Sequence, residues 1–277
     1  MTNNKIPKII YQSWKTKDIK GKMLDAVNTV KNLNPDYEYK FYDDEDCRKF
    51  LLDNFGKPYL IAFDSLIPGA FKCDLWRYAV LYMYGGVYMD IDMIPLVSFN
   101  EIIDDEDEFV SVVDRPRGAI YQAFVACVPR HPIILHCLEL SFYNIMSKRQ
   151  NKKTSDIFLS YTGPIVAGQA FHIYMNNKDT YSEIYPKKYN KINLDYIFRG
   201  DDVMRKSTNK IVFNNKYENY KSINNYSVNK PYKNISDKNK IFFIKVVKVF
   251  LCLTILILIS FVIYRGKYIK CNFNSCK

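Results

Sequence analysis

Histidine is scarce in this 277-residue chain, which contains only three. His131, His136 and His172 lack the spacing of metal ligands, and none lies in a pattern typical of a general base. His131, between Arg130 and Pro132, is typical of a turn residue. The sequence also lacks a Ser–His–Asp arrangement, a zinc-ligand pattern and a phosphate-binding P-loop. These absences argue against a serine hydrolase, a zinc enzyme and a P-loop nucleotide hydrolase.

A cysteine pairing pattern is absent as well. The chain has 7 cysteines, but their spacing does not form a disulfide framework. Unpaired thiols suit a reducing compartment.

Acidic residues are nearly absent from the last part of the chain. Residues 230–277 contain 10 Lys and Arg but one Asp, whereas residues 1–229 contain 30 Lys and Arg and 28 Asp and Glu. The net charge of +11 therefore comes mostly from one end. This distribution argues against nucleic-acid binding and favours a polybasic collar beside anionic lipid head groups.

The basic region surrounds an apolar run of 24 residues, Ile241 to Tyr264. Lys245 and Lys248 interrupt its first third, where long side chains can reach the interface. The length suits ~30 Å of hydrocarbon, so we predict a membrane span in preference to a core helix or an interfacial helix. Residues 1–11 show no signal-peptide core, so we expect a single-pass, C-terminal anchor. Basic residues on both sides of the run leave its orientation open.

The most informative segment is residues 73–95, CDLWRYAVLYMYGGVYMDIDMIP. It predicts a helix, a Gly-Gly turn and a short strand that carries Asp90 and Asp92. Side chains alternate along a strand, so we expect both carboxylates on one side and Val87, Met89 and Ile91 in a core on the other. Such a pair suits Mg²⁺ or Mn²⁺, which take oxygen ligands and often share them with substrate phosphates. A solvated acidic turn is the alternative.

With its neighbours, this segment resembles glycosyltransferase family 32, whose members carry a DXD sugar-binding motif. That family includes α-mannosyltransferases of the secretory pathway and inositol-phosphoceramide mannosyltransferases. The resemblance rests on IPKIIYQSW at 6–14, NPDYEY at 34–39, CDLWRY at 73–78 and YGGVYMDID at 84–92, with weaker similarity in PRHP at 129–132 and TGP at 162–164. It covers about residues 5–170 and is dense only between 70 and 95.

The resemblance implies an α/β fold of the GT-A type, a Rossmann-like nucleotide-sugar-binding domain. It further implies retaining transfer of a hexose from GDP-mannose or a UDP-sugar, with Mn²⁺ or Mg²⁺. The acceptor would be a membrane lipid head group or a glycoprotein, and the predicted anchor favours the lipid. Since the sequence places no second carboxylate as a nucleophile, we predict front-face transfer, in which the departing phosphate helps to deprotonate the acceptor.

Asp92 is the first candidate for direct coordination of the metal, and Asp90 would contact the ribose, or the metal through water. By resemblance, Asp74 would bind the sugar hydroxyls of the donor, and Arg77 the sugar or the phosphate. A planar guanidinium suits either role. An ordinary i,i+3 salt bridge between Asp74 and Arg77 is the alternative.

Three further residues are candidate substrate contacts. Trp14, near the end of the first strand, would stack on the nucleobase, although a core position is equally compatible with the pattern. Tyr88 would line the pocket on the side of Asp90, and the resemblance places Gln122 on the acceptor side.

Two departures from the family pattern keep a second hypothesis open. Tyr11 stands where the family usually has His, and no Trp follows Trp76, whereas relatives often carry a C-terminal His and Ser-Trp element. Residues 213–217 are the candidate equivalent. The second hypothesis is a catalytically degraded, membrane-anchored carbohydrate-binding or scaffold protein. A phosphatase or nuclease is less favoured, because further acidic ligands are not suitably placed.

Apolar periodicity predicts alternating strands and helices at the start of the chain, which is typical of a parallel sheet covered by helices. The predicted strands are 6–12, 37–42, 109–113 and 123–128, and the predicted helices are 23–33, 43–55, 71–83 and 133–146, with Asp43 as an N-cap and Gly56 as a stop. We divide the chain into a GT-A domain (1–186), a loosely ordered Lys/Asn/Tyr-rich end and linker (187–240), a membrane helix (241–264) and a basic tail (265–277).

Overall fold

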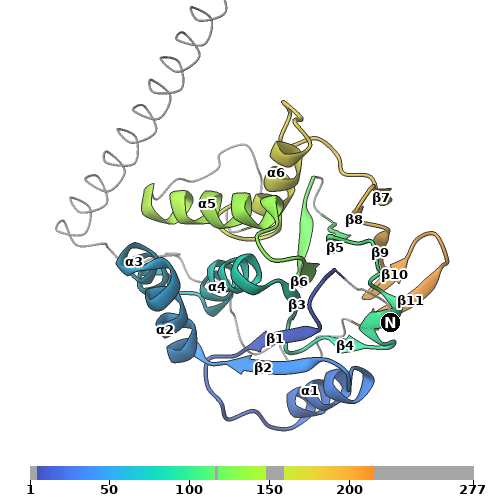
Figure 1. Cartoon of the computed structure of the whole chain (residues 1–277), viewed down its shortest axis with the longest axis horizontal. Helices are drawn as coiled ribbons and strands as arrows, with labels where there is room; N and C mark the ends of the chain where they lie inside the picture. Colours follow the sequence, from blue (N-terminus) through green and yellow to red (C-terminus); the bar gives the residue numbers. More distant parts are fainter. Residues whose placement is uncertain (1–4, 116–117, 148–158, 215–277) are drawn as a thin grey trace, which may run out of the picture. The chain divides into compact units, whose positions relative to one another are not determined.

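The computed structural model of the chain describes residues 5–115, 118–147 and 159–214 (Figure 1). The strands are β1 Ile9–Ser13, β2 Glu38–Tyr42, β3 Gly86–Met89, β4 Ile94–Pro95, β5 Phe109–Val113, β6 Ile120–Cys127, β7 Lys188–Tyr189, β8 Ile192–Asn193, β9 Tyr196–Arg199, β10 Asp202–Arg205 and β11 Lys210–Asn214. The helices are α1 Lys22–Leu33, α2 Asp44–Phe55, α3 Lys57–Ser65, α4 Gly69–Tyr84, α5 Pro132–Ser147 and α6 Pro164–Tyr174, with a 3₁₀ turn at Phe99–Glu101.

The central sheet has seven strands in the order β2-β1-β3-β6-β5-β8-β7. β1 pairs in parallel with β2 and β3, as the alternating pattern predicts. β6 then runs antiparallel to β3 and β5, so the sheet is mixed rather than parallel. Since β3 and β5 both run opposite to β6, the carboxyl ends of β1, β3 and β5 lie at the same edge.

Local sequence signals explain the boundaries of the first helices. The Asp43 carboxylate accepts a hydrogen bond from the Asp46 backbone N–H at 2.9 Å, and the Asp46 carboxylate accepts one from the Asp43 N–H at 3.3 Å. This reciprocal capping box starts α2 at the predicted N-cap. Gly56, with φ 76°, ends the helix as predicted, because the left-handed conformation costs glycine little.

The turn between α4 and β3 requires both of its glycines. Gly85 and Gly86 have φ of 63° and 99°. A Cβ atom on Gly85 would lie 2.6 Å from the Pro129 nitrogen, and one on Gly86 would lie 2.7 Å from the Ile9 carbonyl oxygen. The helix can therefore pass directly into the strand only with glycine at both positions.

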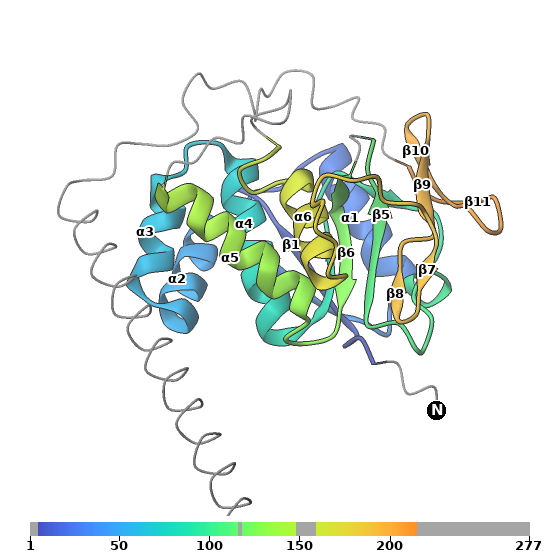
Figure 2. The same cartoon turned by 90° about the horizontal axis from the view of Figure 1, so that it is seen from above.

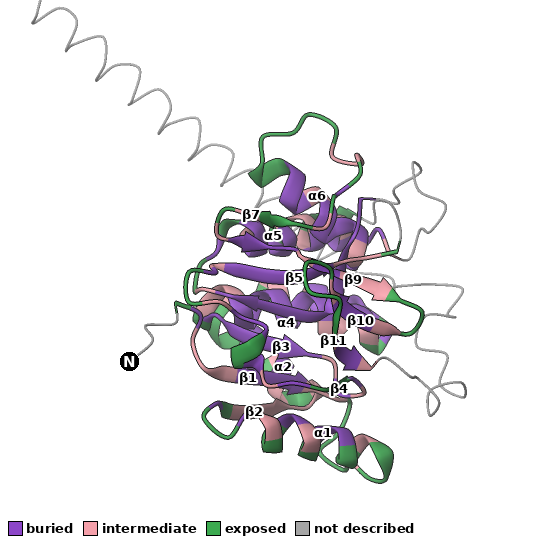
Figure 3. Cartoon of the chain, turned by 90° about the vertical axis from the view of Figure 1, so that its right-hand side faces the viewer, coloured by how far each residue is buried: buried purple, intermediate pink, exposed green. Residues whose placement is uncertain are grey.

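The central sheet separates two layers (Figures 1 and 2). One face packs against α1 and the small sheet, which has the order β4-β11-β10-β9, over a hydrophobic cluster. That cluster includes Val30, Val87, Met89, Phe124 and Phe213. Helix α5 packs against both α4 and α6, and α6 packs on β6 at the other face. Figure 3 shows the central strands buried between these layers.

Two parts of the described fold differ from the prediction. The composition of residues 187–214 predicts loose structure, but this segment forms five strands, β7 to β11, and its Val203 and Phe213 are buried in the core. Its strands are short, and pairing with β4 and β5 from earlier in the chain joins them to the rest of the fold. Helices α3 and α6 also have no counterpart among the predicted elements.

The prediction that the chain is a single-pass membrane protein with a C-terminal anchor is wrong by the structural finding that follows. Across residues 5–115, 118–147 and 159–214, no helix is both long enough and apolar enough to cross a bilayer. The longest of these helices, α4 and α5, have 16 residues each, which is ~24 Å and short of ~30 Å of hydrocarbon. The predicted span at 241–264, the basic tail and most of the predicted linker lie outside the described residues.

Candidate functional site

The two carboxylates of the DXD segment lie in a turn at the carboxyl end of β3. The Asp90 N–H donates to the Ala123 carbonyl oxygen at 2.8 Å, and the Met93 N–H donates to the Asp90 carbonyl oxygen at 3.2 Å. The extended strand therefore ends at Met89, before the first carboxylate, and Asp92 lies within a tight turn. The expectation that both aspartates share one side of an extended segment is wrong, because this turn breaks the alternation of side chains.

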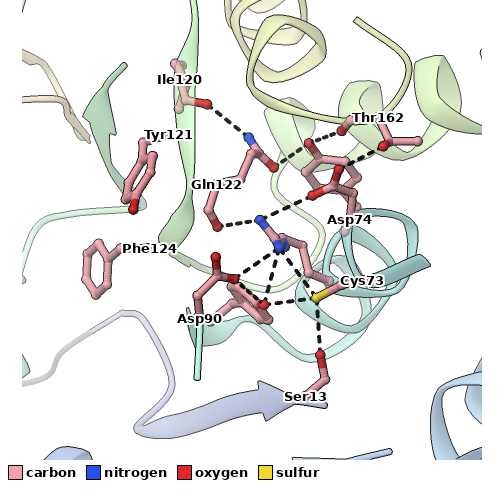
Figure 4. Close-up of polar contacts among 12 residues, drawn as sticks. Ser13, Cys73, Asp74, Asp90, Ile120, Tyr121, Gln122, Phe124 and Thr162 are labelled. Carbon is pink, nitrogen blue, oxygen red and sulfur yellow. Dashed lines mark hydrogen bonds and ion pairs between the residues drawn. The ribbon is translucent and has the colours of Figure 1, made fainter. Parts of the chain in front are cut away.

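Asp90 is held by two donors that converge on one of its oxygens (Figure 4). The Tyr88 hydroxyl donates to Asp90 Oδ1 at 2.6 Å, and Arg77 Nη2 donates to the same oxygen at 3.2 Å. Gln12 Nε2 also donates to the Asp90 carbonyl oxygen at 3.3 Å. No described residue donates to Asp90 Oδ2, and the side chain is 32% exposed. Asp90 is thus fixed in orientation with one oxygen open.

Arg77 lies behind Asp90, with 4% of its side chain exposed. Its Nη1 donates to the Gln122 carbonyl oxygen at 2.6 Å and lies 3.4 Å from Asp74 Oδ1, and its guanidinium lies 4.2 Å from the Tyr88 ring centroid. Burial lowers the pKa of Arg77, but Tyr88, Cys73 and the two carboxylates raise that pKa by more. The guanidinium therefore stays charged and ties α4 to the DXD turn.

Asp74 is buried on the far side of Arg77. Its Oδ2 accepts a hydrogen bond from Thr162 Oγ1 at 2.8 Å, from the loop that leads into α6. Burial raises the pKa of Asp74 to about 6, although Arg77 and Thr162 favour the ionised form. In this arrangement both residues of the predicted sugar-binding pair face a packed polar network.

The Asp92 carboxyl is mostly buried beside Asp90, and no described cation pairs with it. Burial raises its pKa to about 7, and the negative charge of Asp90 adds to this shift. The backbone N–H of Asp92 itself favours the ionised form, but the pKa stays raised. Adjacent carboxylates that repel each other are a donor set that Mg²⁺ or Mn²⁺ would stabilise.

The described residues could supply only some of the ligands of such a cation. Within the described ranges, no group of three or more His, Cys, Asp or Glu side chains is placed to hold a metal. Asp92 and the open oxygen of Asp90 would supply the protein ligands. Substrate phosphates and water commonly complete the coordination of Mg²⁺ at sites with one or two carboxylates.

The other predicted contacts lie at the same edge of the sheet. Trp14 follows β1 directly and is partly exposed, and its backbone N–H donates to the Tyr42 carbonyl oxygen at 3.2 Å. Tyr88 and Gln122 are 1% and 5% exposed. Gln122 Oε1 accepts from the Tyr78 hydroxyl, and its Nε2 donates to the Ile120 carbonyl oxygen at 3.1 Å. Tyr88 and Gln122 therefore face inward.

Some residues of this network have no role in the sequence-based prediction. Ser13 Oγ lies 3.1 Å from Cys73 Sγ, and Cys73 Sγ lies 2.9 Å from the Tyr88 hydroxyl oxygen. Cys73 immediately precedes Asp74, and Thr162 belongs to the weakly similar TGP segment, so both had a faint signal. Ser13 lies in the IPKIIYQSW segment that carries the family resemblance, directly after the predicted first strand, but the sequence assigns it no role.

The structure describes Tyr11 and the start of segment 213–217, where the sequence departs from the family pattern. Tyr11 is fully buried, and its hydroxyl has no hydrogen-bond partner among the described residues. Asn214, at the end of β11, pairs with Ile94, two residues after Asp92. The start of segment 213–217 therefore lies beside the DXD turn, and residues 215–217 lie outside the described part of the chain.

Comparison with protein families gives one match. Residues 21–109 match the family model described as "Glycosyltransferase sugar-binding region containing DXD motif". The matched segment contains Asp74, Arg77, Asp90 and Asp92. The family resemblance seen in the sequence is confirmed.

Several curated proteins are similar to part of the chain. Inositol phosphoceramide mannosyltransferase 3 of Schizosaccharomyces pombe is 41% identical over 132 residues, which is 47% of this chain and 35% of the relative. Inositol phosphoceramide mannosyltransferase 1 of the same organism is 31% identical over 181 residues, 62% of this chain and 53% of the relative. Mannosyl phosphorylinositol ceramide synthase SUR1 of Saccharomyces cerevisiae is 31% identical over 140 residues, 48% of this chain and 34% of the relative. The matches thus span about a third to a half of the length of these relatives.

Among solved structures, PaToxG glycosyltransferase is similar in fold. It is 22% identical with a TM-score of 0.50, over 64% of this chain and 73% of that chain. This similarity supports the mixed α/β fold with a central sheet.

Proposed function

Because residues 21–109 match the model of the DXD glycosyltransferases, we propose that this chain transfers a sugar from a nucleotide-sugar donor to an acceptor. The observation that carries the proposal is the turn of Asp90 and Asp92 at the carboxyl edge of the central sheet, with Arg77 buried behind it. Ligands of open α/β sheets bind beyond the carboxyl ends of the strands. We infer that the mixed sheet is the GT-A arrangement, with the donor site at this edge.

The donor that this site suits is a nucleoside diphosphate sugar. The names of the relatives favour a mannosyl donor, GDP-mannose, and a UDP-sugar is the alternative. Two carboxylates would repel a diphosphate, so we propose that Mn²⁺ or Mg²⁺ binds to Asp92 and to the open oxygen of Asp90. The bound ion would supply stabilisation of the charge on the departing nucleoside diphosphate.

The protein's own side chains would orient the donor and keep water out. Trp14, partly exposed at the end of β1, is placed to stack on the nucleobase. Arg77 acts through Asp90, because its guanidinium is buried and already bonded. Asp74 and Gln122 remain proposed contacts for the donor sugar and the acceptor. Because they are buried, we expect the Thr162 loop and the start of β6 to move when substrate binds.

We propose that transfer proceeds with retention of the anomeric configuration at the front face of the sugar. The departing phosphate would take up the proton of the acceptor hydroxyl, because no described carboxylate is assigned as a nucleophile. A trapped covalent glycosyl-enzyme would contradict this mechanism.

For the acceptor, we propose a glycolipid head group. The relatives are named for mannosyl transfer to inositol phosphoceramide, which makes an inositol phosphate head group the first candidate. A glycan of a glycoprotein is the alternative, since other relatives are named initiation-specific α-1,6-mannosyltransferases.

The test is a transfer assay on the full chain with Mn²⁺, GDP-mannose or UDP-hexoses, and inositol phosphoceramide or an oligomannose glycan as acceptor. We expect metal-dependent product from one donor, with the anomeric configuration read by NMR. Asp92→Asn should abolish turnover, whereas Asp105→Asn, an exposed acidic residue in a separate loop, should not change it. Donor binding without turnover in any combination would favour the degraded, carbohydrate-binding protein instead.

A further inference from the structure

A chain of short polar contacts connects the end of β1 to the DXD turn. Ser13 Oγ lies 3.1 Å from Cys73 Sγ, Cys73 Sγ lies 2.9 Å from the Tyr88 hydroxyl oxygen, and that hydroxyl lies 2.6 Å from Asp90 Oδ1. The four residues come from β1, α4, β3 and the turn after β3. Figure 4 shows the cysteine sulfur between the Ser13 side chain and the guanidinium beside Asp90.

The direction of each hydrogen bond follows from the Asp90 end. An ionised carboxylate only accepts, so the single hydroxyl hydrogen of Tyr88 is donated to Asp90. The Tyr88 oxygen can then only accept in its remaining contacts. Arg77 Nη2 donates to that oxygen at 3.2 Å, and a guanidinium has no acceptor to offer in return.

The thiol of Cys73 is therefore the donor to Tyr88. Without a hydrogen on the line between them, a sulfur and an oxygen 2.9 Å apart would oppose each other with lone pairs. With the S–H directed at Tyr88, the sulfur is an acceptor for its other neighbours. Ser13 Oγ, at 3.1 Å, donates its hydroxyl hydrogen to the sulfur, and Arg77 Nη2 approaches the sulfur at 3.4 Å.

We propose that Cys73 is a positioning residue for Asp90, acting through an ordered donor chain from Ser13 to Cys73 to Tyr88. The chain directs the Tyr88 hydroxyl at Asp90 Oδ1 and leaves Oδ2 for the cation and the donor phosphates. This use of Oδ2 rests on the proposed function. Partners that orient a metal-binding carboxylate typically change metal affinity about 10–100-fold when they are removed.

The same geometry assigns a new role to Tyr88. Its ring is buried and covered by Arg77, so the hydroxyl acts on Asp90 and not on an open pocket. Serine at position 73 would keep both a donor and an acceptor, whereas alanine would remove both.

The direction of the chain is tested first by infrared spectroscopy on the full protein without metal. The S–H stretch of Cys73 is assigned from the difference between wild type and Cys73→Ser. We expect Tyr88→Phe to shift this band toward that of a free thiol, because the thiol loses its acceptor, and Ser13→Ala to leave it nearly in place. A shift in Ser13→Ala with none in Tyr88→Phe would reverse the chain and overturn the proposal.

The role in positioning is tested by titrating Mn²⁺ calorimetrically into the full protein in the presence of GDP, and separately UDP. Cys73→Ala should weaken Mn²⁺ binding about tenfold, and Cys73→Ser should restore it to within about threefold of wild type. Cys137→Ala, which removes another buried thiol from α5, serves as the packing control and should bind Mn²⁺ as wild type does. Equal Mn²⁺ affinity in wild type and Cys73→Ala would overturn the positioning role.

The two proposals fail in distinguishable ways. If wild type binds Mn²⁺ but transfers no sugar, the proposed sugar transfer is wrong, and the calorimetric comparison still decides the role of Cys73. If wild type binds no Mn²⁺ with either nucleotide, the metal-dependent function and the use of Oδ2 are both wrong.

Discussion

Along β3, successive side chains face opposite sides of the central sheet, and the two sides differ in chemistry. Val87 and Met89 are fully buried in the hydrophobic cluster beneath α1 and the small sheet. Tyr88, between them, faces Arg77 of α4 and is also buried. One strand thus supplies apolar packing on one side and a polar network on the other. Because both sides exclude water, the polar side is stable only when its charges are paired.

The two sides of β3 also differ in what they should contribute to stability and to the proposed function. The apolar side should contribute to stability alone, whereas the polar side should contribute both to stability and to the orientation of Asp90. Only substitutions on the polar side should therefore change Mn²⁺ affinity. The first two predictions below test that difference and the next two test neighbouring buried groups, in order of the expected change in the free energy of unfolding.

The largest loss is expected from Arg77→Met. Removing the guanidinium leaves Asp74 and Asp90 without their buried partner, which typically costs about 3–5 kcal/mol. Urea unfolding measures the loss. Asp74→Asn should cost clearly less, because Arg77 keeps Asp90 and the Gln122 carbonyl oxygen. Equal losses of unfolding free energy in the two variants would show that Arg77 contributes no more to stability than Asp74 does.

On the apolar side, Met89→Ala should destabilise the fold by about 2–5 kcal/mol through lost packing and a cavity. The exposed Ile94→Ala should change stability by about 0.5 kcal/mol or less. At a temperature where it stays folded, the Met89→Ala protein should keep the Mn²⁺ affinity of wild type. A large loss of Mn²⁺ affinity would show that the two sides of β3 are not separable.

Asp92→Asn should stabilise the metal-free protein at pH 8. In the wild type, the pKa of Asp92 is about 7 in the folded state and about 3.9 in an unfolded chain. The wild-type fold therefore loses stability as pH rises through this range. The gain from asparagine should therefore be small at pH 4, grow between pH 4 and 7, and level off above 8 at about 1–2 kcal/mol, given the partial exposure of the group. Thermal melts at these pH values measure it. A gain that does not depend on pH would mean that Asp92 ionises freely.

The smallest change is expected at Tyr11. Its buried hydroxyl has no partner among the described residues, so Tyr11→Phe should raise stability by about 1 kcal/mol. Tyr39→Phe is the matched control, because the Tyr39 hydroxyl donates to Gln12 Oε1 at 2.9 Å and its removal should lower stability. A loss at Tyr11 as large as the loss at Tyr39 would show that the Tyr11 hydroxyl is bonded.

The first part of the fold could be predicted because its signals are local. The capping box at Asp43, the stop at Gly56 and the Gly-Gly turn before β3 act within a few residues. On α1, Ala26, Val27 and Val30 are buried, at the spacing of one helical face. Such features need no knowledge of distant segments.

The rest depended on contacts between distant segments. The antiparallel insertion of β6 between β3 and β5, and the pairing of β11 with β4, leave no mark in local periodicity. The five strands in residues 187–214 are short, and their sequence shows no clear strand pattern, so they are recognised only from their pairing in the tertiary structure.

The sequence by itself determined the chemistry at the edge of the sheet: two aspartates after a Gly-Gly turn, preceded by Asp-x-x-Arg on a helix, because these depend on residue type and spacing. Only the tertiary structure decided which oxygen of Asp90 is bonded and which is open. That arrangement requires Ser13, Cys73 and Tyr88 to meet from three elements. Hydrogen-bond direction in a buried network depends on all of its members at once, so no single segment of the chain encodes it.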